Sequence, residues 1–250
     1  MRRPNPQNLT YGIVEELGIA VVTGAYGEAD PFPIEAELCK RFGASRTALR
    51  EAVKMLTAKG LLSARPRQGT RIEPEHRWNL LDPDVLRWML ERKFSLELLA
   101  EFTEMRLAIE PTAAALAAQN ANPEGLAQMT NAIERMRAAA FGDDDPLTSD
   151  IAFHVGLLHA TGNRFYTQLD GLISAALRTS IRLTNRVKGV PLADVNAHKK
   201  VLDAIIAHNP RKASNSVLIM LQEVMNLINV ARRARNGTTA SRARRAARSA

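Results

Sequence analysis

Residues Pro33 to Arg71 have the sequence PIEAELCKRFGASRTALREAVKMLTAKGLLSARPRQGTR. The spacing of apolar residues predicts one helix from about Ile34 to Phe42 and a second that ends near Gly60, with Gly43 supplying the turn. Ser45 is a suitable N-cap for the second helix, because its hydroxyl can accept a hydrogen bond from a free backbone N–H. The segment therefore predicts a helix-turn-helix.

The second of these helices has an apolar side and a basic N-terminus. Apolar residues recur at three- and four-residue spacing within 49–56 and are expected to face the core. Arg46, Thr47 and Arg50 fall outside that stripe, at the end of the helix that a recognition helix presents to the major groove. Arginine can pair with guanine through two hydrogen bonds, and threonine can contact a phosphate or a thymine methyl group. We therefore expect these three residues and Ser45 to contact DNA.

A short hairpin is predicted after Gly60. Two runs, LLSA and TRI, flank a tip of sequence RPRQG, in which proline and glycine favour a turn. A hairpin that follows a helix-turn-helix is a wing, and Arg67, Gln68 and Gly69 are placed to contact the DNA backbone or the minor groove. The alternative is a helical hairpin with a solvated basic face. Residues 7–75 are expected to form this winged helix-turn-helix DNA-binding domain.

These motifs resemble the winged-helix signature of the GntR family of bacterial transcription regulators. The likeness rests on Glu35-Ala-Glu-Leu, on Ser45-Arg-Thr-Ala-Leu-Arg-Glu-Ala and on Arg67-Gln-Gly-Thr. It implies that the recognition-helix and wing-tip residues named above contact DNA. The family often has an arginine at the position of Ala36, so the resemblance also implies that one phosphate contact is absent from this chain.

The composition is that of a helix-rich globular protein. Of the 250 residues, 46% are hydrophobic and 24% are charged, which suits one large domain or two modest ones with apolar cores. No apolar run reaches about 18 residues and no signal-peptide pattern is present, so we expect neither a membrane span nor export. The single Cys39 cannot form an internal disulfide, which agrees with a reducing, cytoplasmic location.

The net charge of +8 is concentrated at the C-terminus. Residues 231–250 contain seven of the 34 basic residues and no acid, which leaves 27 basic against 26 acidic residues in the rest of the chain. Residues 233–250 lack apolar periodicity and are expected to form a disordered, Arg-rich tail. Two interpretations of the tail stay open: non-specific attraction to phosphates, or a solubilising terminus without a further role.

The chain after the predicted wing has helical patterns and no strand alternation. Residues 76–94 are expected to form a linker and a connecting helix, started by Asp82 as N-cap and Pro83 at the first helical position. Residues 95–232 are expected to form an antiparallel domain of six or seven helices. The fold class is thus mainly α, an N-terminal winged helix-turn-helix plus a C-terminal all-α antiparallel bundle. The expected helices span about 95–120, 123–140, 146–161, 164–187, 192–208 and 210–235.

This helical domain resembles the FCD ligand-binding domain of the FadR-type branch of the GntR family. The likeness rests on the segments that begin at Arg106 (RLAIEPTAAALAA), Asp150 (DIAFHV) and His198 (HKKVLDAI). Within the branch, residues 78–90 are most similar to regulators of sugar-acid catabolism such as galactonate operon repressors. The resemblance implies a transcription regulator that binds a small carboxylate, and no enzyme.

A possible metal site lies in this domain. Asp150 and His154 are four residues apart and share one helix face, whereas His198 lies on another predicted helix. One carboxylate and two imidazoles suit Zn²⁺, Mn²⁺ or Ni²⁺, but the residues alone favour the alternative, since an Asp–His pair at this spacing is often a surface hydrogen bond. The FCD resemblance implies that all three residues are metal ligands and line the effector site. It also places Met220 at the position of a further histidine, and a thioether is a poor ligand for these ions. Either three protein ligands hold the metal, or the pocket recognises the effector directly.

Two further residues are expected at the effector site, Arg106 and Asn163. The Arg106 guanidinium can hold a carboxylate, or it can form a salt bridge with Glu110 four residues along. We expect a homodimeric repressor of a metabolic operon that binds an inverted-repeat DNA operator and is released by a small carboxylate such as a sugar acid. The alternative is a metal-dependent enzyme or metabolite-binding protein that uses its winged domain for assembly.

Overall fold

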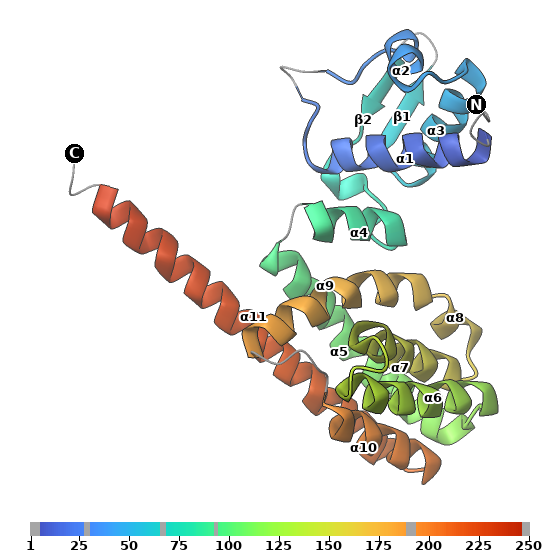
Figure 1. Cartoon of the computed structure of the whole chain (residues 1–250), viewed down its shortest axis with the longest axis vertical. Helices are drawn as coiled ribbons and strands as arrows, with labels where there is room; N and C mark the ends of the chain where they lie inside the picture. The colour runs from blue at the N-terminus through green and yellow to red at the C-terminus, as the bar shows by residue number, and fades with distance from the viewer. Residues whose placement is uncertain (1–5, 28–30, 66–68, 93–94, 189–193, 247–250) are drawn as a thin grey trace. The chain divides into compact units, whose positions relative to one another are not determined.

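The structure, a computed structural model, describes residues 6–27, 31–65, 69–92, 95–188 and 194–246. It divides into two compact units, residues 1–94 and 95–250 (Figure 1). Helices dominate both units, and the two-stranded sheet found among the described residues lies in the first. The expected fold class, a winged helix-turn-helix followed by an all-α bundle, is confirmed.

The first unit packs its helices around an apolar core. Ile13, Leu17 and Val21 are buried at the four-residue spacing of one face of an amphipathic helix. Leu38 and Leu49 are buried on the two helices that follow. The elements are α1 (Pro6–Val22), α2 (Glu35–Phe42), α3 (Arg46–Ala58), β1 (Leu62–Arg65), β2 (Gly69–Ile72), the 3-10 turn η1 (Glu75–Arg77) and α4 (Pro83–Arg92).

The turn between α2 and α3 forms as its sequence predicts. Gly43 has a φ of 58°, a left-handed conformation that glycine adopts without the penalty of a Cβ atom. Ser45 caps α3, because its Oγ accepts a hydrogen bond from the backbone N–H of Ala48 at 3.2 Å. Both signals are local in sequence, so the predicted helix ends agree with the structure to within about two residues.

The wing is an antiparallel hairpin in which Leu62 lies opposite Ile72 and Arg65 lies opposite Gly69. Leu61 and Leu62 are buried, so the hairpin is anchored at its base in the core of the first unit. Two of the expected DNA contacts at its tip, Arg67 and Gln68, lie outside the described residues.

Helix α4 packs into the first unit through Trp88, which is 1% exposed. The indole N–H donates a hydrogen bond to Glu15 on α1 at 2.9 Å, and Arg87 donates two more to the same carboxylate at 2.7 and 2.8 Å. The ring lies against Gly18, where an added Cβ atom would be 2.3 Å from it. The sequence analysis assigns 76–94 to a linker and a connecting helix, and α4 is instead part of this core. The partners of Trp88 are distant in sequence and leave no local signal.

Replacing Trp88 with alanine is expected to destabilise the first unit by about 3–5 kcal/mol, because it removes a large buried ring and leaves a cavity. Hydrogen exchange of α1 and α4 in the full chain measures the change. Trp78→Ala is the matched control, since Trp78 is only partly buried and should cost much less. Equal losses of protection in the two variants would contradict the packing of α4 described here.

The second unit is a bundle in which α5 and α11 pack along each other and α6 packs on α7. Helix α5 continues through Pro111. The expected helix over 164–187 is divided in two, because Asn163 caps a short helix that ends before Asp170. The helices are α5 (Leu96–Asn120), α6 (Pro123–Ala140), α7 (Pro146–Ala160), α8 (Arg164–Thr167), α9 (Asp170–Lys188), α10 (Val195–Ile206) and α11 (Pro210–Ala246).

Two glycines allow α6 and α7 to approach closely. A Cβ atom on Gly125 of α6 would lie 2.1 Å from the backbone N of Ala160, and one on Gly156 of α7 would lie 3.0 Å from the Met129 side chain. Larger side chains would force the two helices apart. The close packing fixes α7, which carries two of the three candidate metal ligands.

Helix α11 is longer than the sequence analysis expects. It continues to Ala246, whereas a helix to about 235 and a disordered tail over 233–250 are predicted. Arginine and alanine are strong helix formers, and the sequence after Pro210 contains no further proline to end the helix. Apolar periodicity, on which the prediction relied, is therefore not needed for the helix to continue. Within the described part of the chain, no helix is both long and apolar enough to cross a bilayer.

Candidate metal centre and nucleic-acid interface

The N-terminus of α3 exposes a basic surface. Ser45, Arg46, Thr47 and Arg50 are all exposed, as expected for residues that contact DNA. The Nε atom of Arg50 lies 3.1 Å from Glu35 on α2, and that of Arg46 lies 4.0 Å from the same carboxylate. These side chains are 66% and 78% exposed, so the ion pairs are weak and can exchange for contacts to a phosphate or a base.

The described part of the wing continues this surface. Gly69 is exposed and has a φ of 77°, which favours glycine at the start of β2. Arg71 on the same strand is also exposed. Exposure at these positions fits a wing that contacts the DNA backbone.

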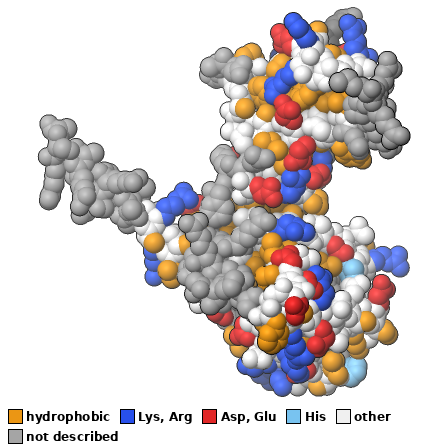
Figure 2. All heavy atoms as spheres, in the orientation of Figure 1, with side chains coloured by type: hydrophobic (Ala, Val, Ile, Leu, Met, Phe, Trp, Pro, Cys, Tyr) orange, Lys and Arg blue, Asp and Glu red, His pale blue; other side chains and the backbone are white. Residues whose placement is uncertain are grey.

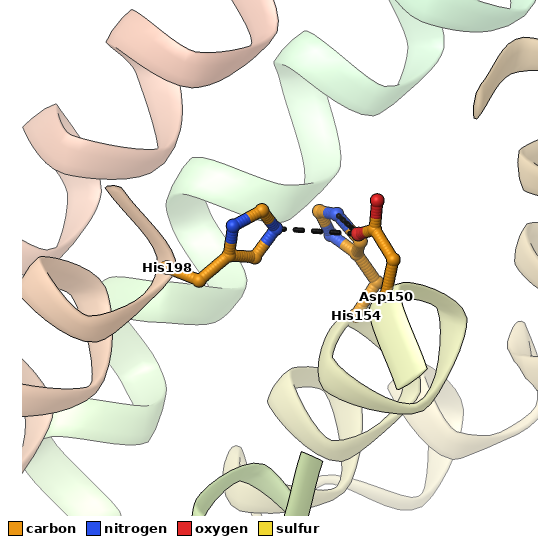
Figure 3. A group of neighbouring side chains, drawn as sticks. All are labelled: Asp150, His154 and His198. Carbon is orange, nitrogen blue, oxygen red and sulfur yellow. Dashed lines mark ion pairs between the residues drawn. The ribbon is translucent and has the colours of Figure 1, made fainter. Parts of the chain in front are cut away.

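The second unit brings Asp150, His154 and His198 together in its interior (Figure 3). Helix α7 supplies the first two residues and α10 supplies the third. The Nε2 atom of His198 lies 3.2 Å from Oδ1 of Asp150, and Nε2 of His154 lies 3.4 Å from the same oxygen. All three side chains are buried. The alternative of a surface hydrogen bond therefore does not describe this group.

The outer nitrogens of the two imidazoles are held by other groups. His154 Nδ1 lies 2.8 Å from Oε2 of Glu110, and His198 Nδ1 lies 2.7 Å from the backbone oxygen of Asp194. Each Nδ1 can donate its proton there, which leaves each Nε2 with a lone pair directed at Asp150. Hydrogen bonds of this kind orient histidine ligands in metal sites. Sequence reasoning considered Glu110 only as a partner of Arg106, because nothing in its spacing points to a histidine on another helix.

Two separations in the cluster and its unpaired atoms suit a cation, and all three candidate ligand atoms lie within 4.8 Å of one another. Oδ1 of Asp150 and Nε2 of His198 are buried without a hydrogen-bond partner. Ligands bound about 2.0–2.1 Å from one ion lie roughly 3–3.4 Å from their nearest neighbours, which matches the separations of both Nε2 atoms from Asp150. A carboxylate with two imidazoles suits Zn²⁺, Mn²⁺ or Ni²⁺. The residues present fit a divalent metal.

The charges around the cluster also favour a cation. Burial opposes ionisation of Asp150, but the two imidazoles of His154 and His198 beside it outweigh burial and lower the pKa of the carboxyl group. Burial likewise opposes charge on His154, yet the Glu110 carboxylate raises the pKa of the imidazole above its ordinary value. The site is thus built to hold positive charge beside Asp150.

Arg106 forms the salt bridge with Glu110 that the sequence left as one of two possibilities. Its Nε and Nη2 atoms lie 2.5 and 3.2 Å from the two carboxylate oxygens. Both side chains are buried, and Nη2 also lies 3.4 Å from Nδ1 of His154. Burial would raise the pKa of Glu110, but Arg106 and then His154 outweigh it and lower the pKa to about 2. Arg106 therefore supports His154, a candidate metal ligand, through Glu110.

Replacing Glu110 with glutamine is expected to destabilise the second unit by about 3–5 kcal/mol, because Arg106 would stay buried without its counter-charge. In the unaltered protein this contribution is complete above the ordinary glutamate pKa of 4.5 and is lost as the pH falls towards about 2. Hydrogen exchange of α5 measures the change. Glu134→Gln breaks an exposed pair with Arg137 and should cost less than about 1 kcal/mol. Similar effects of the two substitutions would refute the structural role of Glu110.

Three other residues of this unit have separate surroundings. Asn163 is the N-cap of α8, with its side-chain oxygen accepting a hydrogen bond from the N–H of Phe165 at 2.9 Å. The Nε2 atom of His159, five residues after His154, lies 2.6 Å from Asp170 on α9. Met220 is half-buried on α11 beside the buried Leu221. Asn163 thus has a structural partner, and its expected contact with an effector stays a prediction.

Comparison with known proteins matches both units to a family. The family of bacterial regulatory proteins called gntR matches residues 9–72, and the FCD domain matches residues 101–223. The galactonate operon transcriptional repressor of Escherichia coli K12 is 33% identical and covers 86% of this chain and 94% of its own length. The uncharacterized HTH-type regulator YieP of the same organism is also 33% identical, and the alignment covers 80% of this chain and 86% of YieP.

Solved structures show the same fold. One of them is Lar, a protein that controls the expression of the Listeria monocytogenes agr system. Its structure aligns with a TM-score of 0.56 at 15% identity, and the alignment covers 92% of this chain and 98% of Lar. A GntR regulator from Rhodococcus sp. RHA1 aligns with a TM-score of 0.50 at 18% identity, and the alignment covers 89% of this chain and 98% of that regulator. The similar proteins are transcription regulators and not enzymes, as the resemblance implied. The chain therefore belongs to the GntR family of bacterial transcription regulators, with an FCD domain as its second unit.

Proposed function

We propose that this regulator represses a metabolic operon and leaves its operator when a small carboxylate, such as a sugar acid, binds the FCD unit. The observation that carries the proposal is the buried cluster of Asp150, His154 and His198, in which two polar atoms have no partner. A chain that is 33% identical is a galactonate operon repressor, and NanR repressors are 26–27% identical over 89% of this chain. All of these relatives support repression, and the galactonate operon repressor also supports a sugar-acid effector.

The DNA-binding surface in this proposal is the exposed N-terminus of α3 with the wing. Arg46, Thr47 and Arg50 enter the major groove and contact base edges, while Ser45 and the wing contact the backbone. A homodimer places two such surfaces on the two halves of an inverted repeat, because two-fold symmetry in a protein requires the same symmetry in its operator. The wing-tip contacts of Arg67, Gln68 and Gly69 belong to the same proposal.

The effector site in this proposal is the metal cluster. A divalent metal bound by Asp150, His154 and His198 would supply a positive charge to a carboxylate of the effector. Arg106 is less suited to that task, because its guanidinium already pairs with Glu110. The effector releases DNA only if it binds more tightly to the conformation that does not fit the operator. Binding in the FCD unit must therefore change the spacing of the two winged helices in the dimer.

A paired measurement tests this function. The operator is first selected by the protein from a random DNA pool, and its binding is followed by fluorescence anisotropy. Thermal unfolding and DNA release are then measured with galactonate and a panel of other sugar acids, before and after metal removal by a chelator. We expect one acid to raise the melting temperature and to release the DNA, both only in the metal-loaded protein. Stabilisation that survives the chelator would remove the metal from the proposal, and no response to any acid would refute it.

A further inference from the structure

The last part of α11 extends beyond the packed part of the FCD unit (Figure 1). Among the residues of α11 whose side chains are described, which end at Arg235, Ile228 is the last buried one, and it packs against Leu99 and Ala100 near the start of α5. One turn later, Arg232 lies 3.8 Å from Glu97. The helix then continues to Ala246, about 21 Å further at 1.5 Å per residue. We call residues 232–250 the C-terminal arm.

The C-terminal arm carries nearly all of the net charge of the chain. Its seven arginines and no acid contrast with the balance of 27 basic and 26 acidic residues elsewhere. On the visible face of the FCD unit, basic and acidic side chains are interspersed (Figure 2). A separate block of one sign is therefore a feature of the arm and not of the visible face of the FCD unit.

The sequence of the arm excludes an apolar partner. Apart from arginine it contains only Ala, Asn, Gly, Thr and Ser, and its last large apolar neighbour is Val230. The arginines at 232, 233, 235, 242, 244, 245 and 248 follow no regular three- or four-residue repeat in the sequence. An amphipathic membrane helix needs an apolar face with bulky residues, and the sequence of the arm contains no bulky apolar residue. A basic segment without an apolar face suits a partner that presents negative charge on more than one side.

We propose that the C-terminal arm binds the phosphates of duplex DNA without reading its sequence. A groove of DNA has a phosphate chain on each side, and basic helices of other regulators lie in such grooves. Because the arm and the winged helix belong to one chain, DNA bound by the winged helix is present to the arm at a raised effective concentration. Each phosphate contact releases a counter-ion, so the arm increases affinity for every sequence and steepens its dependence on salt. This property is separate from operator recognition by α3 and from the effector site.

The test replaces Arg242, Arg244, Arg245 and Arg248 with glutamine, which removes charge but keeps helix propensity. Binding of a labelled random-sequence 30-base-pair duplex is measured between about 50 and 200 mM NaCl by fluorescence anisotropy. We expect the slope of log K against log salt to become shallower by about 0.9 for each lost contact, and Kd at 0.1 M salt to rise about 10-fold or more. Operator binding should weaken by the same factor, because the arm reads no sequence.

A matched control removes four positive charges from exposed positions elsewhere on the FCD unit. The variant replaces Arg164, Lys200, Arg211 and Lys212 with glutamine. It should retain the Kd and the salt slope of the parent. Equal effects of the two variants would mean that only net charge matters, and an unchanged arm variant would overturn the proposal directly. Loss of binding to anionic vesicles without loss of DNA binding would overturn it in favour of a membrane surface. Failure here leaves operator recognition by Arg46 untouched, since that is measured by discrimination between sequences.

Discussion

Arg46→Ala is expected to weaken operator binding by about 100-fold or more while leaving the fold intact. A bidentate arginine–guanine contact contributes about 1–3 kcal/mol of discrimination, and a homodimer on an inverted repeat loses the contact twice. The Arg46 side chain is 78% exposed and has no packing role that its removal would disturb. Fluorescence anisotropy with operator and random duplexes measures the loss, and circular dichroism checks the fold. Binding to random DNA should change much less than binding to the operator.

Two substitutions on the same face act as controls for this result. Lys54→Ala removes a charge from α3 two turns further along, where the side chain pairs with Glu51, and should have little effect. Glu35→Gln removes the acid that lies beside both Arg46 and Arg50, and should maintain or increase affinity. A loss for Lys54→Ala as large as that for Arg46→Ala would show that general charge, and not a positioned contact, binds the operator.

The winged helix could be predicted well because its signals are local. Gly43, Ser45 and the apolar spacing of α3 each specify their own few residues, and the structure agrees with all of them. The packing of α4 could not be predicted, since Trp88 depends on Glu15 and Gly18 more than 60 residues earlier. Tertiary contacts of this kind have no signature in a window of sequence.

The three candidate ligands of the metal centre could be predicted from the sequence, but the groups that contact the outer nitrogens of the two histidines could not. Asp150 and His154 share a helix face by spacing, and the FCD resemblance added His198. The sequence did not predict the contact of Glu110 with His154 or that of the Asp194 carbonyl with His198. Both contacts are seen only in the structure, where α5, α7 and α10 are packed together. These supporting groups decide which nitrogen of each imidazole faces inward. Sequence therefore suggests a set of candidate ligands, and packing brings them together with both Nε2 atoms near Asp150.

His198→Ala is expected to reduce bound metal from about one ion per chain to less than a tenth of that. It leaves only Asp150 and His154 at the cluster, and two protein ligands hold Zn²⁺, Mn²⁺ or Ni²⁺ weakly. The metal content of the purified protein is measured by elemental analysis, and the melting temperature is measured with each ion and with a chelator. His159→Ala is the matched control, because His159 pairs with Asp170 and should not alter metal content.

Met220→His tests the same site in the opposite direction. The FCD resemblance places a histidine ligand at this position, so the substitution is expected to tighten metal binding by about 10-fold or more if α11 borders the cluster as the resemblance implies. The added ligand would also occupy a coordination position that the proposal assigns to the effector. The variant should then retain metal more strongly and respond less to the sugar acid that stabilises the parent. Two results together would contradict the metal site: unchanged metal affinity in Met220→His and full metal retention in His198→Ala. They would show that Asp150, His154 and His198 bind no metal. The buried unpaired atoms of the cluster would then have to contact the effector directly.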